Sequence, residues 1–207
     1  MTAERAKLGF LGVAGYLVPL VQSVLFWAGL MTLPFASFLA LLFTGSPEIL
    51  PRAISDFVAP FAIPDKVFVA TGFLMLVYSA IYLLVNRKGG LVTSGPYRLV
   101  RHPQYLGMIL STLGLTSWSV WILRNTFGIG FLNPEQTVAV WFAELFVYIF
   151  LAYVEEQHLL RLYGESFLEY RCEVPLLIPF LRTSKQTPQM LLSITIPAVV
   201  LFVLLLF

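Results

Sequence analysis

The stretch that decides the fold reads TSGPYRLVRHPQYLG and spans residues 93–107. It separates two long apolar segments, with a turn signal at Gly95-Pro96 and a further proline at Pro103. Glycine and proline favour turns, whereas proline is well tolerated in the first turn of a helix. A helix is therefore expected to begin at His102-Pro103. The same stretch holds two arginines and one of only two histidines in the chain, which favours a polar ligand such as a cofactor.

The composition indicates a chain whose solvent is the bilayer. Of 207 residues, 58% are hydrophobic and 12% are charged, with a mean hydropathy of +0.85, whereas soluble domains carry about 25% charged residues. The length indicates one domain. The net charge of +2 gives no indication of a nucleic-acid partner. The single Cys172 excludes an internal disulfide, and two histidines are too few for a typical zinc site, so no metal is expected.

Four segments are long and apolar enough for a transmembrane helix, which needs about 20 residues: Val67–Val85, Tyr105–Leu123, Val138–Val154 and Met190–Phe207. An earlier block, Leu8–Phe43, is long for one span and short for two. Gly29 and Pro34 can divide it into a span near 8–30 and a shorter re-entrant piece, and a tight hairpin is the alternative. The expected fold is an all-α integral membrane protein with about five transmembrane helices, or six with the hairpin.

The basic residues predict an orientation for these spans. With a single first span, ten of the 13 Lys and Arg residues fall on one side of the membrane, and the positive-inside rule assigns that side to the cytoplasm. Segments 86–104 and 155–189 are cytoplasmic on either interpretation of the first block. The chain then divides into N-terminal transmembrane segments with a proline-rich loop (1–66), a core (67–182) and an additional C-terminal transmembrane helix (183–207).

The start of the helix at Pro103 offers an anion site. Its first backbone N–H groups lack helical acceptors, and the helix dipole favours negative charge there. Arg98 and Arg101 add positive charge beside it. A carboxylate or phosphate suits this arrangement. The ordinary alternative is a basic loop that faces anionic lipid headgroups, and His102 alone is more often a helix-capping group than a ligand.

A second polar cluster, Glu155-Glu156-Gln157-His158, follows the span Val138–Val154. Neighbouring residues on a helix point about 100° apart, so at most one of the two glutamates faces the bundle interior, whereas Glu155 and His158 share a face. One carboxylate is expected to bind a cationic or hydroxyl-bearing ligand opposite the basic loop. The alternative is a solvated extension of the helix. In either case the helix is expected to stop at Gly164.

Two further features come from the same region. Residues 165–171 predict a short amphipathic helix that lies on the membrane. Glu144 lies within a predicted span, where an ionisable group is a functional candidate. The interpretation that we favour for Glu144 is structural, with a hydrogen bond from Tyr78, Tyr82 or Trp118.

These clusters, in this order, resemble the superfamily of membrane-bound methyltransferases that includes isoprenylcysteine carboxyl methyltransferase and phosphatidylethanolamine N-methyltransferase. The resemblance covers about residues 85–180 and is carried by Leu91–Tyr97, Arg101–Gly107, Glu155-Glu156, Tyr163-Gly164-Glu165, Tyr170 and Val174-Pro175. It implies an enzyme that uses S-adenosylmethionine, bound in a pocket at the cytoplasmic face. It assigns cofactor contacts to Leu91, Val92, Tyr97, His102, Pro103, Gln104, Tyr105 and one of Glu155 and Glu156. To these we add Arg101, whose charge suits the cofactor's carboxylate.

The resemblance also implies a lipophilic acceptor that enters from the bilayer, with its head near His102 and Glu155. Carboxyl O-methylation of the isoprenylcysteine type is the first interpretation. If the acceptor is an ammonium or a thiol, a proton must leave. The residues expected at the reaction centre are Glu155, Glu156 or His158 as proton acceptors, together with Arg98.

One position departs from the pattern of the carboxyl methyltransferases. In those enzymes an arginine about one helical turn before the glutamates is thought to address the substrate, and Leu151 stands at the matching position here. Related lipid-amine methyltransferases need no such anchor, so N-methylation of a lipid amine, or S-methylation, is the alternative.

Two other interpretations stay open. Sterol reductases share a similar membrane fold but use NADPH, and they would carry extra basic residues for the 2′-phosphate and a longer chain. A non-catalytic membrane sensor or accessory protein on the same fold is the alternative from a different class. The intact Arg101-His102-Pro103 and Glu155-Glu156 motifs argue against it.

Overall fold

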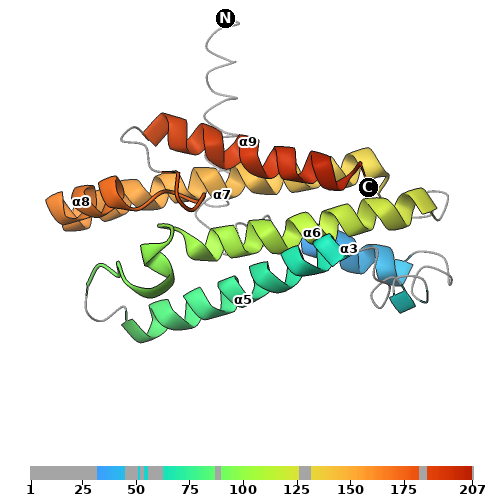
Figure 1. Ribbon diagram of the computed structural model, residues 1–207, viewed down its shortest axis with the longest axis horizontal. Helices are drawn as coiled ribbons and strands as arrows, with labels where there is room; N and C mark the ends of the chain where they lie inside the picture. The colour runs from blue at the N-terminus through green and yellow to red at the C-terminus, as the bar shows by residue number, and fades with distance from the viewer. Residues whose placement is uncertain are drawn as a thin grey trace, which may run out of the picture.

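The computed structural model describes residues 32–44, 51, 54–55, 63–86, 90–125, 132–181 and 186–206. Its elements within these ranges are helical: α3 (Leu33–Thr44), α5 (Ile63–Asn86), the 3₁₀ turn η3 (Gly95–Arg98), α6 (Pro103–Asn125), α7 (Pro134–Tyr163), α8 (Glu165–Glu173) and α9 (Gln186–Leu204). The four long helices run alongside one another, and α8 lies at one end of the bundle (Figure 1).

The predicted all-α membrane architecture is confirmed for the described residues. Four helices are long and apolar enough to cross a membrane: Pro64–Asn86, Pro103–Asn125, Pro134–Tyr163 and Thr187–Leu204. Each overlaps one of the four predicted spans, and together they make the chain a multi-pass integral membrane protein. The span near 8–30 lies outside the described residues, and with it the choice between five and six spans. The shorter piece after Gly29 is present as α3, which begins beside Pro34.

Helix α6 is the centre of the bundle. It contacts α3, α5, α7 and α9, and 83% of its spanning segment is buried inside the protein, against 11% for α5. Because protein covers α6 on all sides, its interior positions take small and hydroxyl-bearing residues, which let helices approach closely within a bilayer. Their hydroxyl groups bond back to the same helix: Ser111 donates to the carbonyl of Gly107 at 2.9 Å, and Ser119 to that of Leu115 at 2.7 Å.

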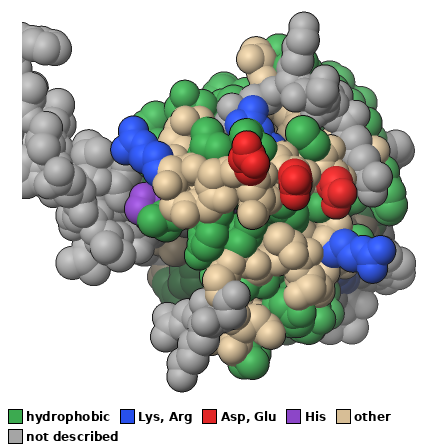
Figure 2. Space-filling view, turned by 90° about the vertical axis from the view of Figure 1, so that its left-hand side faces the viewer, with side chains coloured by type: hydrophobic (Ala, Val, Ile, Leu, Met, Phe, Trp, Pro, Cys, Tyr) green, Lys and Arg blue, Asp and Glu red, His purple; other side chains and the backbone are tan. Residues whose placement is uncertain are grey.

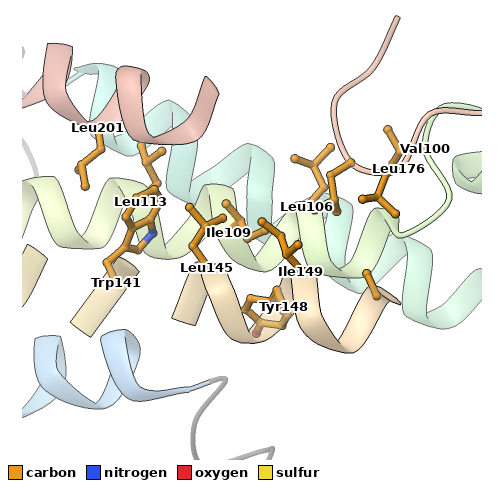
Figure 3. Packing of buried hydrophobic residues seen from close by; sticks show 12 residues of the cluster. Val100, Leu106, Ile109, Leu113, Trp141, Leu145, Tyr148, Ile149, Leu176 and Leu201 are labelled. Atoms are coloured by element: carbon orange, nitrogen blue, oxygen red, sulfur yellow. The ribbon is translucent and has the colours of Figure 1, made fainter. Parts of the chain in front are cut away.

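The largest apolar core lies where α6, α7 and α9 meet. Its members are buried side chains that interdigitate along the facing sides of the helices (Figure 3). They include Ile109 and Leu113 of α6, Trp141 and Leu145 of α7, and Leu201 of α9. This packing holds the start of α6 and the end of α7 at the same end of the molecule.

Two glycines set the separation of α5 and α6. A Cβ atom on Gly72 would lie 2.5 Å from the carbonyl oxygen of Gly107, and one on Gly107 would lie 2.6 Å from the backbone nitrogen of Leu76. No side chain fits at these distances, so the two backbones are in direct contact. This contact fixes the start of α6 relative to the end of α5, and hence the loop that joins them.

Helix α7 has well-defined ends. Asn133 and Gln136 form a capping box at its start, with their side chains and backbone N–H groups paired at 2.8 and 3.0 Å. Gly164, with φ of +54°, ends it after Tyr163, as the sequence predicts, and α8 follows directly. Thirty residues rise about 45 Å, whereas the hydrocarbon core is about 30 Å thick. The last turns of α7 therefore extend past the apolar layer and carry polar side chains at its edge.

The α5–α6 contact yields a first prediction. We expect Gly72→Val to lower the thermal unfolding midpoint of the detergent-solubilised protein strongly, because the new side chain would force the two backbones apart. Ala70→Val is the matched control, since Ala70 is an exposed residue on the same helix. Equal midpoints for the two variants would contradict this account of the helix contact.

Candidate functional site

The turn before α6 is held from two sides. Gly95, with φ of +61°, packs against the ring of Tyr82, and the hydroxyl groups of Tyr82 and Ser94 lie 2.8 Å apart. From the other side, the Tyr170 hydroxyl of α8 donates to the backbone carbonyl of Tyr97 at 2.7 Å. Burial, together with the nearby charge of Glu155, raises the pKa of Tyr97 to about 12. The Tyr97 side chain therefore stays a neutral phenol at a fixed position.

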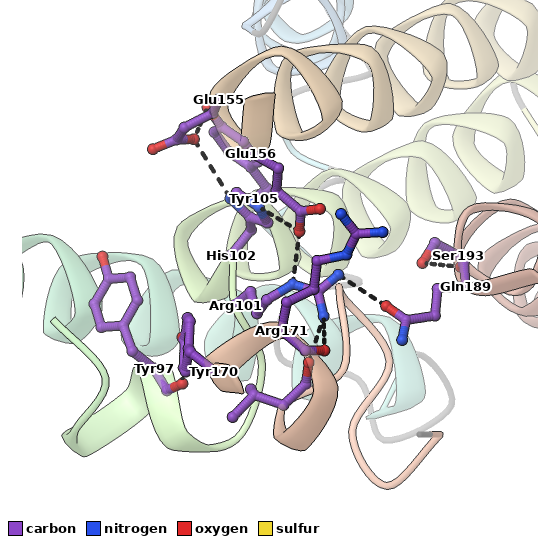
Figure 4. A network of polar contacts seen from close by, with 11 residues as sticks. Tyr97, Arg101, His102, Tyr105, Glu155, Glu156, Tyr170, Arg171, Gln189 and Ser193 are labelled. Carbon is purple, nitrogen blue, oxygen red and sulfur yellow. Dashed lines mark hydrogen bonds and ion pairs between the residues drawn. The ribbon is translucent and has the colours of Figure 1, made fainter. Parts of the chain in front are cut away.

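Arg101 is the hub of a buried polar network (Figure 4). Only 4% of the residue is exposed, and its Nε donates to the Glu156 carboxylate at 2.6 Å. Its Nη1 donates to the backbone carbonyls of Arg171 and Val174, and its Nη2 donates to Gln189 Oε1 at 2.8 Å. The backbone N–H of Arg101 also bonds the carbonyl of Pro175 at 2.9 Å. One side chain thus connects the loop before α6 to α7, α8 and α9.

His102 lies between the two carboxylates that follow the apolar part of α7. Its Nδ1 is 3.4 Å from Glu155 Oε2, and its Nε2 is 3.5 Å from Glu156 Oε1. The imidazole stacks on Tyr105 at a ring distance of 5.3 Å, and the Tyr105 hydroxyl donates to Glu155 Oε2 at 3.0 Å. Burial lowers the pKa of His102, but the two carboxylates outweigh it and hold the pKa above its usual value of 6.5.

The two glutamates have different surroundings. The Glu156 side chain is fully buried and ion-paired with Arg101, whereas 46% of the Glu155 side chain is exposed. The sequence predicts that at most one of them faces the bundle interior. Glu156 is that residue, whereas Glu155 reaches the cavity described next.

A cavity of about 200 Å³ opens beside His102, between the start of α6 and the end of α7. Eight of the residues predicted to contact a cofactor line it: Leu91, Val92, Tyr97, Arg101, His102, Gln104, Tyr105 and Glu155. Residues separated by more than 60 positions in the sequence therefore converge on one hollow. Seen from this end, the molecule presents charged side chains of both signs among apolar ones (Figure 2).

The other predicted site residues lie elsewhere. Pro103 is buried in the first turn of α6, and Glu156 is buried behind His102. Arg98 and His158 are exposed and are not among the residues that line the cavity.

Some cavity residues were not predicted as site residues. Leu83 and Gly90 contribute from α5 and the loop after it, and Leu159 and Tyr163 from α7. Leu159 and Tyr163 follow Glu155 by four and eight positions, so helical spacing from Glu155 could have identified both. Tyr170 also lines the cavity and belongs to the motif that carries the resemblance, without a site role there.

A larger cavity, of about 420 Å³, lies at the opposite end of α6. It is lined by residues such as Asp65, Trp121 and Arg124, and none of the motif residues reaches it. Volume alone would select this cavity. The convergence of motif residues selects the smaller one as the candidate site.

The structure corrects the hydrogen-bond partners that the sequence suggests for Glu144. The side chain is 2% exposed, and its carboxylate lies near the Thr112 hydroxyl of α6 without a well-formed hydrogen bond to any described residue. The prediction of a hydrogen bond from Tyr78, Tyr82 or Trp118 is therefore wrong. Tyr78 is exposed on α5, and Tyr82 pairs with Ser94 instead. For the two tyrosines the reason is topological, because α5 packs on α6. Trp118 belongs to α6 but packs against Phe38 of α3.

Comparisons with known proteins address the same region. A family model described as "Phospholipid methyltransferase" matches residues 61–166, just over half of the chain. A Protein-S-isoprenylcysteine O-methyltransferase of Xenopus laevis is 32% identical over 110 residues, which is 52% of this chain and 34% of that protein. Protein-S-isoprenylcysteine O-methyltransferase B of Arabidopsis thaliana is 34% identical over 92 residues, which is 44% of this chain and 40% of that protein. The match thus spans well under half of each relative's own length. No solved structure matches the chain at a significant level.

The different surroundings of the two glutamates yield a second prediction. Glu156→Leu leaves the buried Arg101 guanidinium without its counter-charge, and breaking a buried pair in this way costs about 3–5 kcal/mol. Glu155→Leu removes a half-exposed carboxylate and is expected to cost about 1 kcal/mol or less. Thermal unfolding of both variants measures the contrast. An equal loss for the two would contradict the structural role assigned to Glu156.

The raised pKa of His102 yields a third prediction. Because the folded-state pKa lies above the unfolded value of about 6.5, His102 contributes stability that is fully present below that value. This stability is lost as the pH rises through the folded-state pKa. The unfolding midpoint of the wild type, relative to His102→Gln, should therefore fall on going from mildly acidic to alkaline pH. A difference that grows with pH would contradict the ion pairs of His102.

Proposed function

Because the chain belongs to the phospholipid methyltransferase family, we propose that it transfers the methyl group of S-adenosylmethionine to a lipophilic acceptor held in the membrane. Family membership makes the chain a membrane methyltransferase. The observation that supports this site is the cavity in which aromatic rings, one half-exposed carboxylate and the start of a helix come together. We assign the cofactor to this cavity.

The residues present suit the groups of this cofactor. The first N–H groups of α6, at Gln104 and Tyr105, lie where a helix accepts a carboxylate. The carboxylate of Glu155 suits an ammonium group or ribose hydroxyls, and the faces of Tyr97 and Tyr105 suit a sulfonium cation. Leu91 and Val92 form an apolar wall of the cavity for the rest of the cofactor. Arg101 lies at the edge of the cavity with its N–H groups engaged by protein acceptors and its charge balanced by Glu156, so its role is to orient its neighbours.

The chain's residues act by placement rather than by covalent chemistry. The cofactor supplies an electrophilic methyl group when bound, and the protein must align the acceptor with it and keep water away. His102 and Tyr105 hold the Glu155 carboxylate at a fixed position between them. The basic bias of the loops supports a cytoplasmic position for this end of the bundle, from which the cofactor would enter from water and the acceptor from the bilayer.

The first candidate acceptor is a carboxylate on an isoprenylated cysteine. The names of the relatives from Xenopus laevis and Arabidopsis thaliana support it. The carboxylate oxygen forms the new bond to the methyl carbon, the sulfur–methyl bond breaks, and no proton has to leave. The products are a methyl ester and the neutral thioether of the cofactor.

The second candidate acceptor is a lipid amine. It is favoured by Leu151, which is apolar and half-buried where an anchoring arginine would stand, and by the phospholipid methyltransferase match. An amine must lose a proton before or during transfer. Glu155 is the suited acceptor for that proton, since it lines the cavity, whereas Glu156 is buried and His158 lies outside the lining.

The fourth prediction tests the cofactor site. Purified protein should bind S-adenosylmethionine in calorimetry, and His102→Ala should weaken binding at least about tenfold, which is 1.4 kcal/mol. Glu155→Gln should also weaken binding while keeping the wild-type unfolding midpoint. Wild-type affinity in His102→Ala would remove His102 from the site. Wild-type protein that binds no cofactor would favour a non-catalytic sensor on the same fold.

A labelled-methyl assay tests the acceptor. The protein is incubated with methyl-labelled cofactor and either total membrane lipid or an isoprenylated cysteine with a free carboxyl group. A methyl ester releases volatile label as methanol in alkali, whereas an N-methyl group does not. Alkali-labile label on the cysteine derivative supports the first candidate, and alkali-stable label in lipid supports the second. Label in neither substrate would contradict the proposed activity.

A further inference from the structure

We propose that Gln189, on the C-terminal helix α9, is a positioning residue of this site that holds Arg101 in the orientation presenting Glu156 to His102. The C-terminal helix then has a role in the site itself. The proposal deepens the proposed function, on which it rests for what the site binds. Its main test concerns the geometry of the protein and needs no cofactor.

Gln189 is a buried amide on α9, a helix without charged residues. The residue is 6% exposed, and its Oε1 accepts from Arg101 Nη2 at 2.8 Å. Polar side chains inside membrane helices are unfavourable unless they are bonded, and they commonly mark function. The partner of this amide is a charged guanidinium, so the bond is of the stronger charge-assisted kind. Figure 4 shows Gln189 reaching from α9 towards the network around Arg101.

The guanidinium divides its donors among three parts of the chain. Nη1 donates to the backbone carbonyls of Arg171 and Val174, at the end of α8. Nε and Nη2 lie on the other edge of the planar group. There Nε donates to the Glu156 carboxylate, and Nη2 donates to Gln189 Oε1. Nη2 carries two N–H groups, and Gln189 accepts from this nitrogen, whereas Glu156 is bonded to Nε at 2.6 Å.

This division controls where the Glu156 carboxylate points. Its Oε1 lies 2.6 Å from Arg101 Nε and 3.5 Å from His102 Nε2, so the same oxygen faces both cations. Without Gln189, Nη2 would be a buried donor without that acceptor, and such a group is costly to leave unmet. The second oxygen of Glu156 is then drawn to Nη2 in a two-bond pairing with the guanidinium edge. That movement takes the carboxylate away from His102.

The pKa of His102 is sensitive to this movement of the Glu156 carboxylate. The charged and titratable groups that face His102 are Glu155 and Glu156 of α7 and Tyr105 of α6, with Arg101 beside them. Gln189 bonds Arg101, and Arg101 bonds Glu156, so the contacts lead from Gln189 to the imidazole through these two side chains. A change in the titration of His102 on substitution of Gln189 is therefore the signature of positioning.

The fifth prediction uses the full chain in lipid nanodiscs with isotope-labelled histidine. The chain has two histidines, and His158→Gln assigns the two signals. We expect Gln189→Leu to lower the titration midpoint of His102 by about half a pH unit or more, since one of its two carboxylates is withdrawn. S-adenosylmethionine affinity should fall about fivefold in the same variant, which corresponds to about 1 kcal/mol.

Two further variants separate positioning from general loss of structure. Ser193→Ala is the matched control: Ser193 is buried one turn along α9, and its hydroxyl bonds the Gln189 carbonyl at 2.8 Å without touching Arg101. It should leave the His102 midpoint unchanged even if the unfolding temperature falls. Gln189→Glu keeps an acceptor oxygen for Nη2 and should return the midpoint to the wild-type value or above it.

Several outcomes would overturn the proposal. These are a folded Gln189→Leu with wild-type titration of His102, a Ser193→Ala with the same fall as Gln189→Leu, and a Gln189→Glu that titrates like the leucine variant. If Gln189→Leu does not fold, Gln189→Asn shortens the side chain and is judged by the same criterion. Wild-type protein that binds no S-adenosylmethionine contradicts the proposed function and leaves the titration test intact.

Discussion

The ion pair of Arg101 and Glu156 is the interaction on which the rest of the site depends. Two buried charges are expensive to remove from water, and their attraction repays this only when every remaining donor and acceptor is satisfied. Here Glu156, two backbone carbonyls and the Gln189 amide accept four of the five N–H groups of the guanidinium. An apolar pair of similar volume would fill the same space. What it could not do is hold His102 between two carboxylates, so we attribute the pair to specificity of geometry rather than to stability.

The position of that pair follows from the packing of α6. Direct backbone contact at Gly72 and Gly107 fixes α6 against α5, and the apolar core of α6, α7 and α9 fixes its other sides. The start of α6 therefore has little freedom to move, and it carries Arg101, His102 and Tyr105 within two turns. A site built at the ends of rigid helices keeps its geometry with few loop residues, which suits a reaction that depends on alignment.

Much of this arrangement could be predicted from the sequence, because its signals are local. Apolar length predicts the spans, and Gly164 predicts the end of α7. Eight of the ten residues expected to contact a cofactor, among them His102, Tyr105 and Glu155, line one cavity. The choice between Glu155 and Glu156 could not be predicted, since their spacing shows only that they diverge. It depends on where Arg101 lies, seventy or more positions from its carbonyl partners and 88 from Gln189. The prediction of hydrogen-bond partners for Glu144 was wrong for the same reason, because the sequence does not show which side chains of the bundle lie next to each other.

The charged side chains of the site form an inner and an outer pair. Arg101 and Glu156 are buried and bonded to each other, whereas His102 and Glu155 form the next layer, nearer the cavity. The inner pair has no net charge, so it orients the outer layer without adding a field of one sign. The outer layer is likewise balanced when His102 is protonated, the form that its two neighbouring carboxylates favour. Such a site suits a ligand that carries both a carboxylate and cationic groups, because neither sign of charge dominates where it binds.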